Sequence, residues 1–189
     1  MSDTISFTQT AGIATLTFNN PQRRNALGAA ELDAIESGLS SLDENARALL
    51  ITSSDDRVFC AGADLTQILD GSLSGDRFQS VTNKIAALPI PSIATLSGNV
   101  FGGGAELALS CDFRLAREDI VLRIPAAAIG LCYPVEGIER ITRRLGPSIA
   151  RRLLVAAETF SSEQLLALGL VDAVYPVSYT HLTLPTSAI

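Results

Sequence analysis

Short apolar runs alternate with segments of helical periodicity along most of this chain of 189 residues, and this alternation most constrains its fold. Ala48 to Thr52 and Ser92 to Leu96 are typical of buried strands, and each follows a segment with apolar residues at helical spacing. Parallel strands need crossover connections, which helices usually supply. The sequence therefore predicts an α/β domain with largely parallel strands.

The two ends of this pattern have clear boundaries. Ile5 to Thr10 and Ile13 to Phe18 alternate apolar and polar residues around Ala11-Gly12, which predicts a hairpin. Towards the C-terminus, Ser161 and Gln164 match a capping box, and Gly169 stands where a helix C-cap is expected. Helices are also predicted over residues 29–42, 76–88, 135–145 and 147–157.

Composition excludes several classes of partner. The net charge is −6 and the basic residues are scattered, so the sequence predicts no nucleic-acid binding. No apolar stretch approaches the roughly 20 residues that span a bilayer, and residues 1–10 lack the layout of a signal peptide. We therefore expect a cytoplasmic protein without membrane contact.

The three cysteines are Cys60, Cys111 and Cys132. Their odd number and irregular spacing indicate neither a disulfide framework nor a zinc site. Because their neighbours are mostly apolar or small, we expect three buried, reduced thiols and no metal site.

The segment from Phe59 to Leu65 is the first that suggests chemistry. The small residues Ala61, Gly62 and Ala63 allow a ligand to approach the main chain, and a helical pattern begins soon afterwards. Backbone N–H groups at such a strand-to-helix turn can face an anionic oxygen. The alternative is a tight structural turn in which Asp64 caps the helix.

The segment from Gly98 to Glu106 is the second. Its three consecutive glycines allow close backbone approach, but Leu107 stands where a dinucleotide-binding motif would place its last glycine, and no P-loop sequence follows. Glu106 is expected in the first turn of the next helix, as a general base or as a charge favourable to the helix dipole. Close helix packing is the alternative explanation of the glycines.

The pair of segments is more specific than either one. One N–H donor from each can hold the oxygen of an enolate or a tetrahedral intermediate. Loss of such a donor typically costs about 3 kcal/mol of transition-state stabilisation. We therefore expect a backbone oxyanion hole at this place.

From about Ile5 to Pro176 the chain resembles the enoyl-CoA hydratase/isomerase (crotonase) family. The matching segments are Asn20-Pro21, 24–27, 59–65, Gly98, 102–108, Cys111-Asp112, 129–131 and 167–171. The resemblance implies a spiral of ββα units and an acyl-CoA substrate, with coenzyme A entering as part of that substrate and no separate cofactor. It also implies a homotrimer or a dimer of trimers.

The resemblance also assigns residues. It implies that the N–H groups of Ala63 and Gly103 form the oxyanion hole, and that Ala61, Asp64 and Leu65 help to line the coenzyme A site. Arg24 is implied near the coenzyme phosphates, with a solvated surface charge as the alternative.

One family feature is missing. Hydratases of the family use two glutamates, and Glu106 matches the first, whereas the second falls on Ala126 in this sequence. An alanine cannot transfer a proton. Glu136 is a possible substitute, and its alternative is an exposed charge at a helix N-terminus that stabilises the helix by about 0.5 kcal/mol.

The C-terminal stretch departs from the rest. Residues 178–189 change composition abruptly and contain His181, the only histidine. We expect residues 1–177 to form an acyl-CoA-binding domain, shorter at its C-terminal side than family members, and residues 178–189 to be a non-native tail.

Three functions remain open from the sequence. The first is a hydratase or isomerase that acts through a thioester enolate. The second is a non-catalytic acyl-CoA-binding protein or a shortened pseudoenzyme. The third and weakest is a thioester hydrolase, because the histidine that a nucleophilic mechanism needs is present only as His181.

Overall fold

The computed structural model describes residues 4–177. The stretch 178–189, which contains His181, lies outside the described residues. The prediction that this stretch is a non-native tail therefore concerns residues that the structure does not describe.

The larger sheet has six strands and confirms the predicted hairpin. Their order is β1 (Ile5–Thr10), β2 (Ile13–Phe18), β4 (Ala48–Ser53), β7 (Ser92–Leu96), β9 (Phe113–Arg117) and β12 (Ala173–Tyr175). β1 and β2 pair antiparallel, with Thr10 opposite Ile13. Every other neighbouring pair in this sheet is parallel, as the alternation of strands and helices predicts.

Two smaller sheets consist of short strands, most of which the sequence did not predict. One has the order β11 (Thr159–Ser161), β10 (Val121–Arg123), β8 (Asn99–Phe101) and β5 (Val58–Cys60). The other pairs β3 (Ala26–Leu27) with β6 (Gly62–Ala63). Of these strands the sequence predicts only β10, as a strand-like run over Ile120 to Ile124, because runs of two or three residues otherwise carry too little periodicity to identify.

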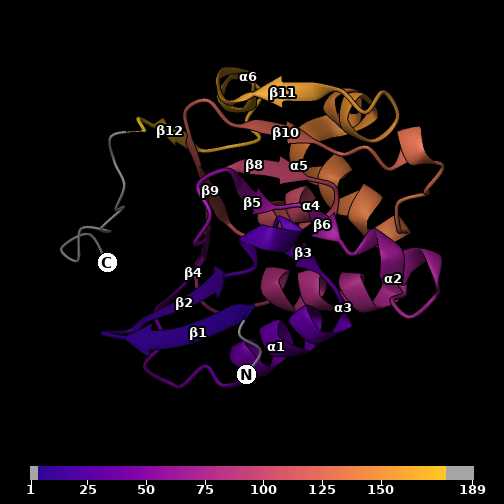
Figure 1. Ribbon diagram of the computed structural model, residues 1–189. Helices are drawn as coiled ribbons and strands as arrows, with labels where there is room; N and C mark the ends of the chain where they lie inside the picture. Colours follow the sequence, from indigo (N-terminus) through magenta and orange to yellow (C-terminus); the bar gives the residue numbers. More distant parts are fainter. Residues whose placement is uncertain (1–3, 178–189) are drawn as a thin grey trace.

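The strands form a repeated unit. β4 is followed by β5, β7 by β8, and β9 by β10, and in each pair the first strand lies in the larger sheet and the second in the four-stranded sheet (Figure 1). A helix follows each pair. The neighbours β4, β7 and β9 thus repeat the order of β5, β8 and β10, which is the spiral of ββα units that the resemblance implies.

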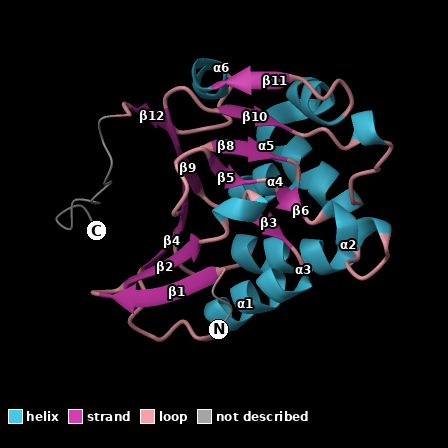
Figure 2. Cartoon of the chain, viewed as in Figure 1, coloured by secondary structure: helices cyan, strands magenta, loops and turns pink. Residues whose placement is uncertain are grey.

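Most helices lie on one side of the strands (Figure 2). They are α1 (Ala29–Ser40), α2 (Leu65–Leu69), α3 (Gly75–Ala86), α4 (Gly103–Ser110), α5 (Val135–Leu154) and α6 (Ser162–Ala167), with 3-10 turns η1 (Pro21–Arg23) and η2 (Ala127–Ile129). Ser161 caps α6 through the predicted capping box with Gln164. α5 is broken at Gly146 (φ 76°, ψ 161°), so the two predicted helices are two arms of one element.

The core confirms two of the three predicted buried thiols. Cys60 and Cys111 are fully buried, and desolvation raises the pKa of each thiol to about 12. The prediction was wrong for Cys132, which is exposed. Its apolar neighbours Leu131 and Tyr133 line a pocket and do not enclose the thiol in a close-packed interior.

Within residues 4–177, no helix is long and apolar enough to cross a membrane. The same residues contain no group of three or more His, Cys, Asp or Glu side chains that could hold a metal ion.

Candidate active site

A pocket of about 260 Å³ opens where the Phe59–Leu65 and Gly98–Glu106 segments meet. Its walls are mostly apolar, and Glu106 contributes a carboxylate. The lining residues are Ala61, Ala63, Leu65, Ile68, Gly75, Phe78, Gly102, Gly103, Glu106, Pro125, Ala126, Ile129, Leu131, Cys132, Tyr133 and Pro134. The structure therefore brings together both predicted oxyanion-hole residues, two of the predicted coenzyme-binding residues and Glu106.

The first wall is the turn from β6 into α2. Asp64 caps α2 by accepting a hydrogen bond from Thr66 N at 3.0 Å, which confirms the predicted cap and does not test the role of the backbone N–H groups in this turn. Its other carboxylate oxygen accepts from Arg23 Nη2 at 2.6 Å. Because its carboxylate is engaged twice and buried, Asp64 can meet a ligand chiefly through its main chain. Leu65, in contrast, is half-exposed at the pocket.

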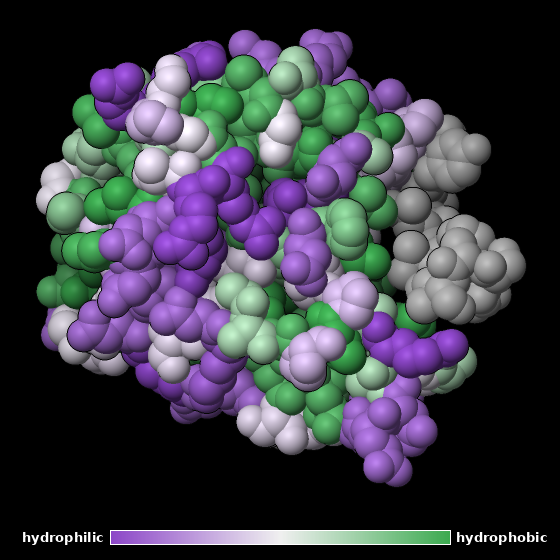
Figure 3. Space-filling view, turned by 180° about the vertical axis from the view of Figure 1, so that it is seen from behind, coloured by the Kyte–Doolittle hydropathy of each residue, from purple (hydrophilic) through white to green (hydrophobic). Residues whose placement is uncertain are grey.

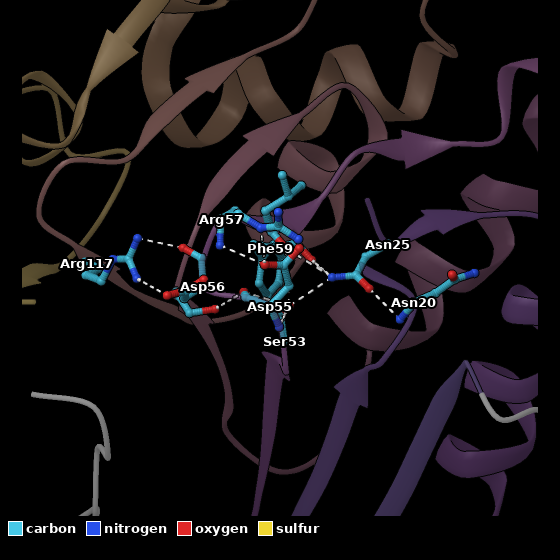
Figure 4. A network of polar contacts seen from close by, with 10 residues as sticks. Asn20, Asn25, Ser53, Asp55, Asp56, Arg57, Phe59 and Arg117 are labelled. Carbon is cyan, nitrogen blue, oxygen red and sulfur yellow. Dashed lines mark hydrogen bonds and ion pairs between the residues drawn. The ribbon is translucent and has the colours of Figure 1, made fainter. Parts of the chain in front are cut away.

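A buried asparagine holds this turn in place (Figure 4). Asn25 has a left-handed backbone (φ 54°), and its Nδ2 donates to Ser53 Oγ at 2.9 Å, Val58 O at 3.0 Å and Phe59 O at 3.1 Å. Its Oδ1 accepts from Asn20 N at 2.8 Å. These bonds join the loop before β3 to β4 and β5, directly upstream of the pocket.

Arg24 lies next to this anchor. Its carbonyl accepts from Ala61 N at 3.0 Å, so its main chain is tied to the pocket wall, while its side chain is exposed. An exposed side chain at this position is compatible with both sequence interpretations of Arg24, a contact with coenzyme phosphates and a solvated surface charge.

The second wall is the start of α4. Gly102 adopts φ 51° and ψ −125°, a conformation that glycine adopts readily and that residues with a β-carbon avoid. A β-carbon at Gly62 would lie 2.5 Å from Gly103 N, so the two segments meet backbone to backbone. A β-carbon at Gly104 would lie 2.6 Å from Cys60 O. The glycines therefore serve close packing, and Gly103 also faces the pocket.

Glu106 is 2 % exposed and projects from the first turn of α4 into the pocket. Its Oε1 lies 3.2 Å from Arg140 Nη1 of α5 and accepts a hydrogen bond from Thr82 Oγ1 of α3 at 3.4 Å. Burial raises the pKa of Glu106, and the charge of Arg140 opposes that rise. A carboxylate with a raised pKa is a stronger base, which suits proton abstraction near neutral pH.

A second set of residues, which local sequence patterns do not predict, surrounds Glu106. Arg140 also donates to Thr82 Oγ1 at 3.2 Å and to Asn83, and Gln79 Nε2 donates to Thr82 Oγ1 at 3.0 Å. The partners come from α3 and α5, more than 20 positions from Glu106 in the sequence. No local motif connects them, because helix packing alone brings them together.

Glu136 lies elsewhere. It is exposed in the first turn of α5 and lines a separate open hollow with Asp76 and Lys84, whereas Glu106 faces the pocket. Ala126 does line the pocket, and its methyl group carries no exchangeable proton. The structure thus does not bring Glu106 and Glu136 into one cavity.

Comparison with known proteins matches this architecture. The sequence model described as enoyl-CoA hydratase/isomerase matches residues 8–183. Mitochondrial enoyl-CoA hydratase domain-containing protein 2 of Bos taurus is 38 % identical over 168 residues, which is 85 % of this chain and 57 % of that protein. Crotonyl-CoA hydratase of Syntrophomonas wolfei is 32 % identical over 86 % of this chain and 65 % of its own length. The chain thus spans less than two thirds of these two relatives.

A solved structure gives the same result for the fold. The enoyl-CoA hydratase of Bacillus anthracis superposes with a TM-score of 0.87 at 28 % identity, covering 94 % of this chain and 72 % of that one. This superposition confirms the predicted crotonase-like α/β fold. The match over residues 8–183 and the shared fold show that this chain belongs to the enoyl-CoA hydratase/isomerase family.

Proposed function

We propose that the protein acts on the double bond of an enoyl-CoA, by adding water or by moving the bond, through a thioester enolate. One observation carries the proposal: Ala63 of β6 lines the same pocket as Gly103 and Glu106, which both belong to α4. The relatives named above include hydratases, which supports the same class of reaction.

The Ala63 and Gly103 N–H groups hold the thioester oxygen in this proposal. The backbone contact between Gly62 and Gly103 brings the two donors to one place without an intervening side chain. Two fixed N–H dipoles stabilise the negative charge that develops on the oxygen in the enolate. Each donor contributes about 3 kcal/mol to transition-state stabilisation if it behaves as in other oxyanion holes.

Glu106 moves the proton. In hydration it takes a proton from the attacking water, and in isomerisation it removes a proton from carbon. Its burial favours the base by raising its pKa, and the ion pair with Arg140 fixes the direction of the carboxylate. Because Ala126 provides no second carboxylate, isomerisation is as well supported as hydration.

Coenzyme A enters as part of the substrate. Ala61 and Leu65 contact it at the pocket wall, Asp64 contributes its main chain, and Arg24 meets its phosphates. The exposed guanidinium of Arg24 and the tie between Arg24 O and Ala61 N support this placement.

The test is incubation with saturated and unsaturated acyl-CoAs in heavy water, followed by mass spectrometry. A gain of water identifies a hydratase, and deuterium uptake or bond migration without water identifies an isomerase. Glu106→Gln keeps the shape of the side chain but removes the base. Wild-type turnover by this variant would contradict the role of Glu106.

A non-catalytic acyl-CoA-binding protein is the second candidate. Its support is the closed set of contacts among Glu106, Arg140 and Thr82, which already satisfies the carboxylate, together with the methyl group of Ala126. Tight binding of acyl-CoAs without water addition, bond migration or deuterium uptake would select it. Hydrolysis of the thioester is the weakest candidate, since His181 is the only histidine of the chain.

The proposal extends to assembly and location: a homotrimer or a dimer of trimers in the cytoplasm. Large apolar side chains that could pack between subunits are exposed on α2 and α5, including Leu69, Val135 and Val155, the last of these just after α5. Hydrophobic areas also interrupt the hydrophilic surface seen in Figure 3. Light scattering of the purified chain measures the number of subunits.

A further inference from the structure

Tyr133 brings a hydroxyl group to the pocket beside the proposed oxyanion hole. It lies in the loop between η2 and α5 and lines the same pocket as Glu106. Its hydroxyl donates to Gly102 O at 3.1 Å, one residue before Gly103. The hydroxyl is therefore held next to the place where the thioester oxygen of the proposed substrate would bind.

Tyr133 and Glu106 are also neighbours. A β-carbon at Gly137 would lie 2.9 Å from Glu106 Oε1 and 3.1 Å from Tyr133 Cδ1. The carboxylate and the edge of the ring thus rest against the same α-carbon, which only glycine leaves room for. Burial and the negative charge of Glu106 raise the pKa of Tyr133 well above its ordinary value, so the phenol keeps its proton.

Few other side chains in the pocket can carry a proton. Among its lining residues only Glu106, Cys132 and Tyr133 have an ionisable side chain. Cys132 is exposed, whereas Tyr133 is partly buried and contacts the segment that starts α4. The phenol is therefore the second group placed to exchange a proton with a bound acyl chain.

We propose that Tyr133 is a second catalytic residue, whose hydroxyl delivers the proton to the α-carbon of the enolate while Glu106 handles the other proton. This assignment rests on the proposed function and names the residue that completes it. It explains how a pocket with one carboxylate can perform both proton transfers.

The proton transfers balance without a further reactant. In hydration, water oxygen bonds to the β-carbon as its proton passes to Glu106, and the electrons of the double bond move to the thioester oxygen. The enolate electrons then form a bond from the α-carbon to the Tyr133 proton as the O–H bond breaks and the carbonyl reforms. The phenolate oxygen takes the proton held by Glu106, which restores both groups. In isomerisation the proton on Glu106 comes from the γ-carbon instead.

Several titratable or charged groups lie around the phenol. Glu106 faces it from α4, the buried Cys60 thiol from β5, and Arg140 of α5 pairs with Glu106. Cys132 is adjacent in the chain. Ring fluorination changes the acidity of the phenol and leaves all of these groups in place, so it isolates the contribution of Tyr133.

The first experiment compares Tyr133→Phe with the wild-type chain in turnover of the enoyl-CoA that the wild type converts. Removing a general acid is expected to lower turnover by about 10²–10⁴-fold, whereas the affinity for a saturated acyl-CoA should change by less than about threefold. Tyr175→Phe, on β12, removes a phenol hydroxyl outside the pocket and is the matched control. Turnover of Tyr133→Phe within about threefold of wild type would overturn the assignment.

The second experiment places a fluorotyrosine at position 133, which keeps the packing and the bond to Gly102 O. If the phenol transfers a proton, the alkaline limb of the pH–rate profile moves to lower pH. An unmoved profile would show that Tyr133 only braces Gly102 and would overturn the assignment. The assignment would also be overturned if Cys132→Ala lost turnover while Tyr133→Phe kept the turnover of the wild type.

The outcomes separate the two proposals. If the wild type converts no acyl-CoA, the proposed function fails and the assignment of Tyr133 fails with it. If the wild type is active, Glu106→Gln is inactive and Tyr133→Phe is active, only the assignment of Tyr133 fails.

Discussion

The first turns of α4 and α5 are similar in sequence and different in surroundings. Each has a glutamate in its first turn and glycine close to it. Glu106 is nearly inaccessible, pairs with Arg140 and faces the pocket, whereas Glu136 is exposed beside Asp76 and Lys84. The comparison shows that position in a helix does not determine the pKa or the access to a pocket of a carboxylate. The elements packed against the carboxylate determine them, because they set its desolvation and its charge partners.

The largest expected effect tests this difference directly. Glu106→Gln should lower turnover of an enoyl-CoA by about 10²–10⁴-fold, because it removes the proposed base. Glu136→Gln should have a much smaller effect, since Glu136 does not line the pocket. Steady-state kinetics on both variants measure the contrast. A loss in Glu136→Gln as large as that in Glu106→Gln would mean that the two carboxylates act together.

The glycines at the two helices give the next contrast. Gly62 (φ 89°), against the first residue of α4, and Gly146 (φ 76°), inside α5, both have left-handed backbones. A β-carbon at Gly62 would lie 2.5 Å from Gly103 N, whereas one at Gly146 would meet nothing within 4 Å. Gly62→Ala should cost about 2–5 kcal/mol from backbone strain and overpacking, and Gly146→Ala about 1–2 kcal/mol from strain alone. Urea unfolding measures both costs, and equal losses would contradict the close approach at α4.

Arg140 links the two helices and provides a third test. Its charge opposes the rise in the pKa of Glu106 that burial causes. Arg140→Gln should therefore raise that pKa further and move the acid limb of the pH–rate profile to higher pH. Arg143→Gln, at an exposed site on the same helix, is the control. Arg140→Lys keeps the charge, so its acid limb should lie closer to that of the wild type. An acid limb that does not move in Arg140→Gln would exclude the ion pair from catalysis.

The smallest expected effect is on stability. Because the pKa of Glu106 is raised from 4.5, the native state binds this proton more tightly than the unfolded chain does. The stability that Glu106 contributes should therefore fall as the pH rises from 4.5 through the raised pKa. Glu106→Gln cannot titrate and should lack this component. The measurement is the difference in unfolding free energy between wild type and variant across that range. A difference that grows in favour of the wild type with pH would contradict the assigned direction.

Local patterns were enough for much of the fold. The hairpin, the strands β4 and β7 and the cap of α6 followed from periodicity and capping residues, because these depend on neighbours close in the chain. The break in α5 at Gly146 agrees with the two helices predicted over residues 135–145 and 147–157. The short strands β5, β6 and β8 did not, since two or three residues cannot define a period, and their pairing is set by the ββα unit.

In the candidate site, too, some features follow from the local sequence and others depend on the tertiary structure. The sequence by itself determined that two turns are rich in glycine and alanine and that Glu106 follows the second, since small residues and spacing are local properties. Only the tertiary structure decided that Arg140 pairs with Glu106, that Tyr133 reaches Gly102 and that Glu136 stays outside the pocket. These relations involve residues from α4, α5, the loop before α5 and Gly102 at the start of α4. Burial and charge pairing at that range depend on how the helices pack, which no local pattern in the sequence encodes.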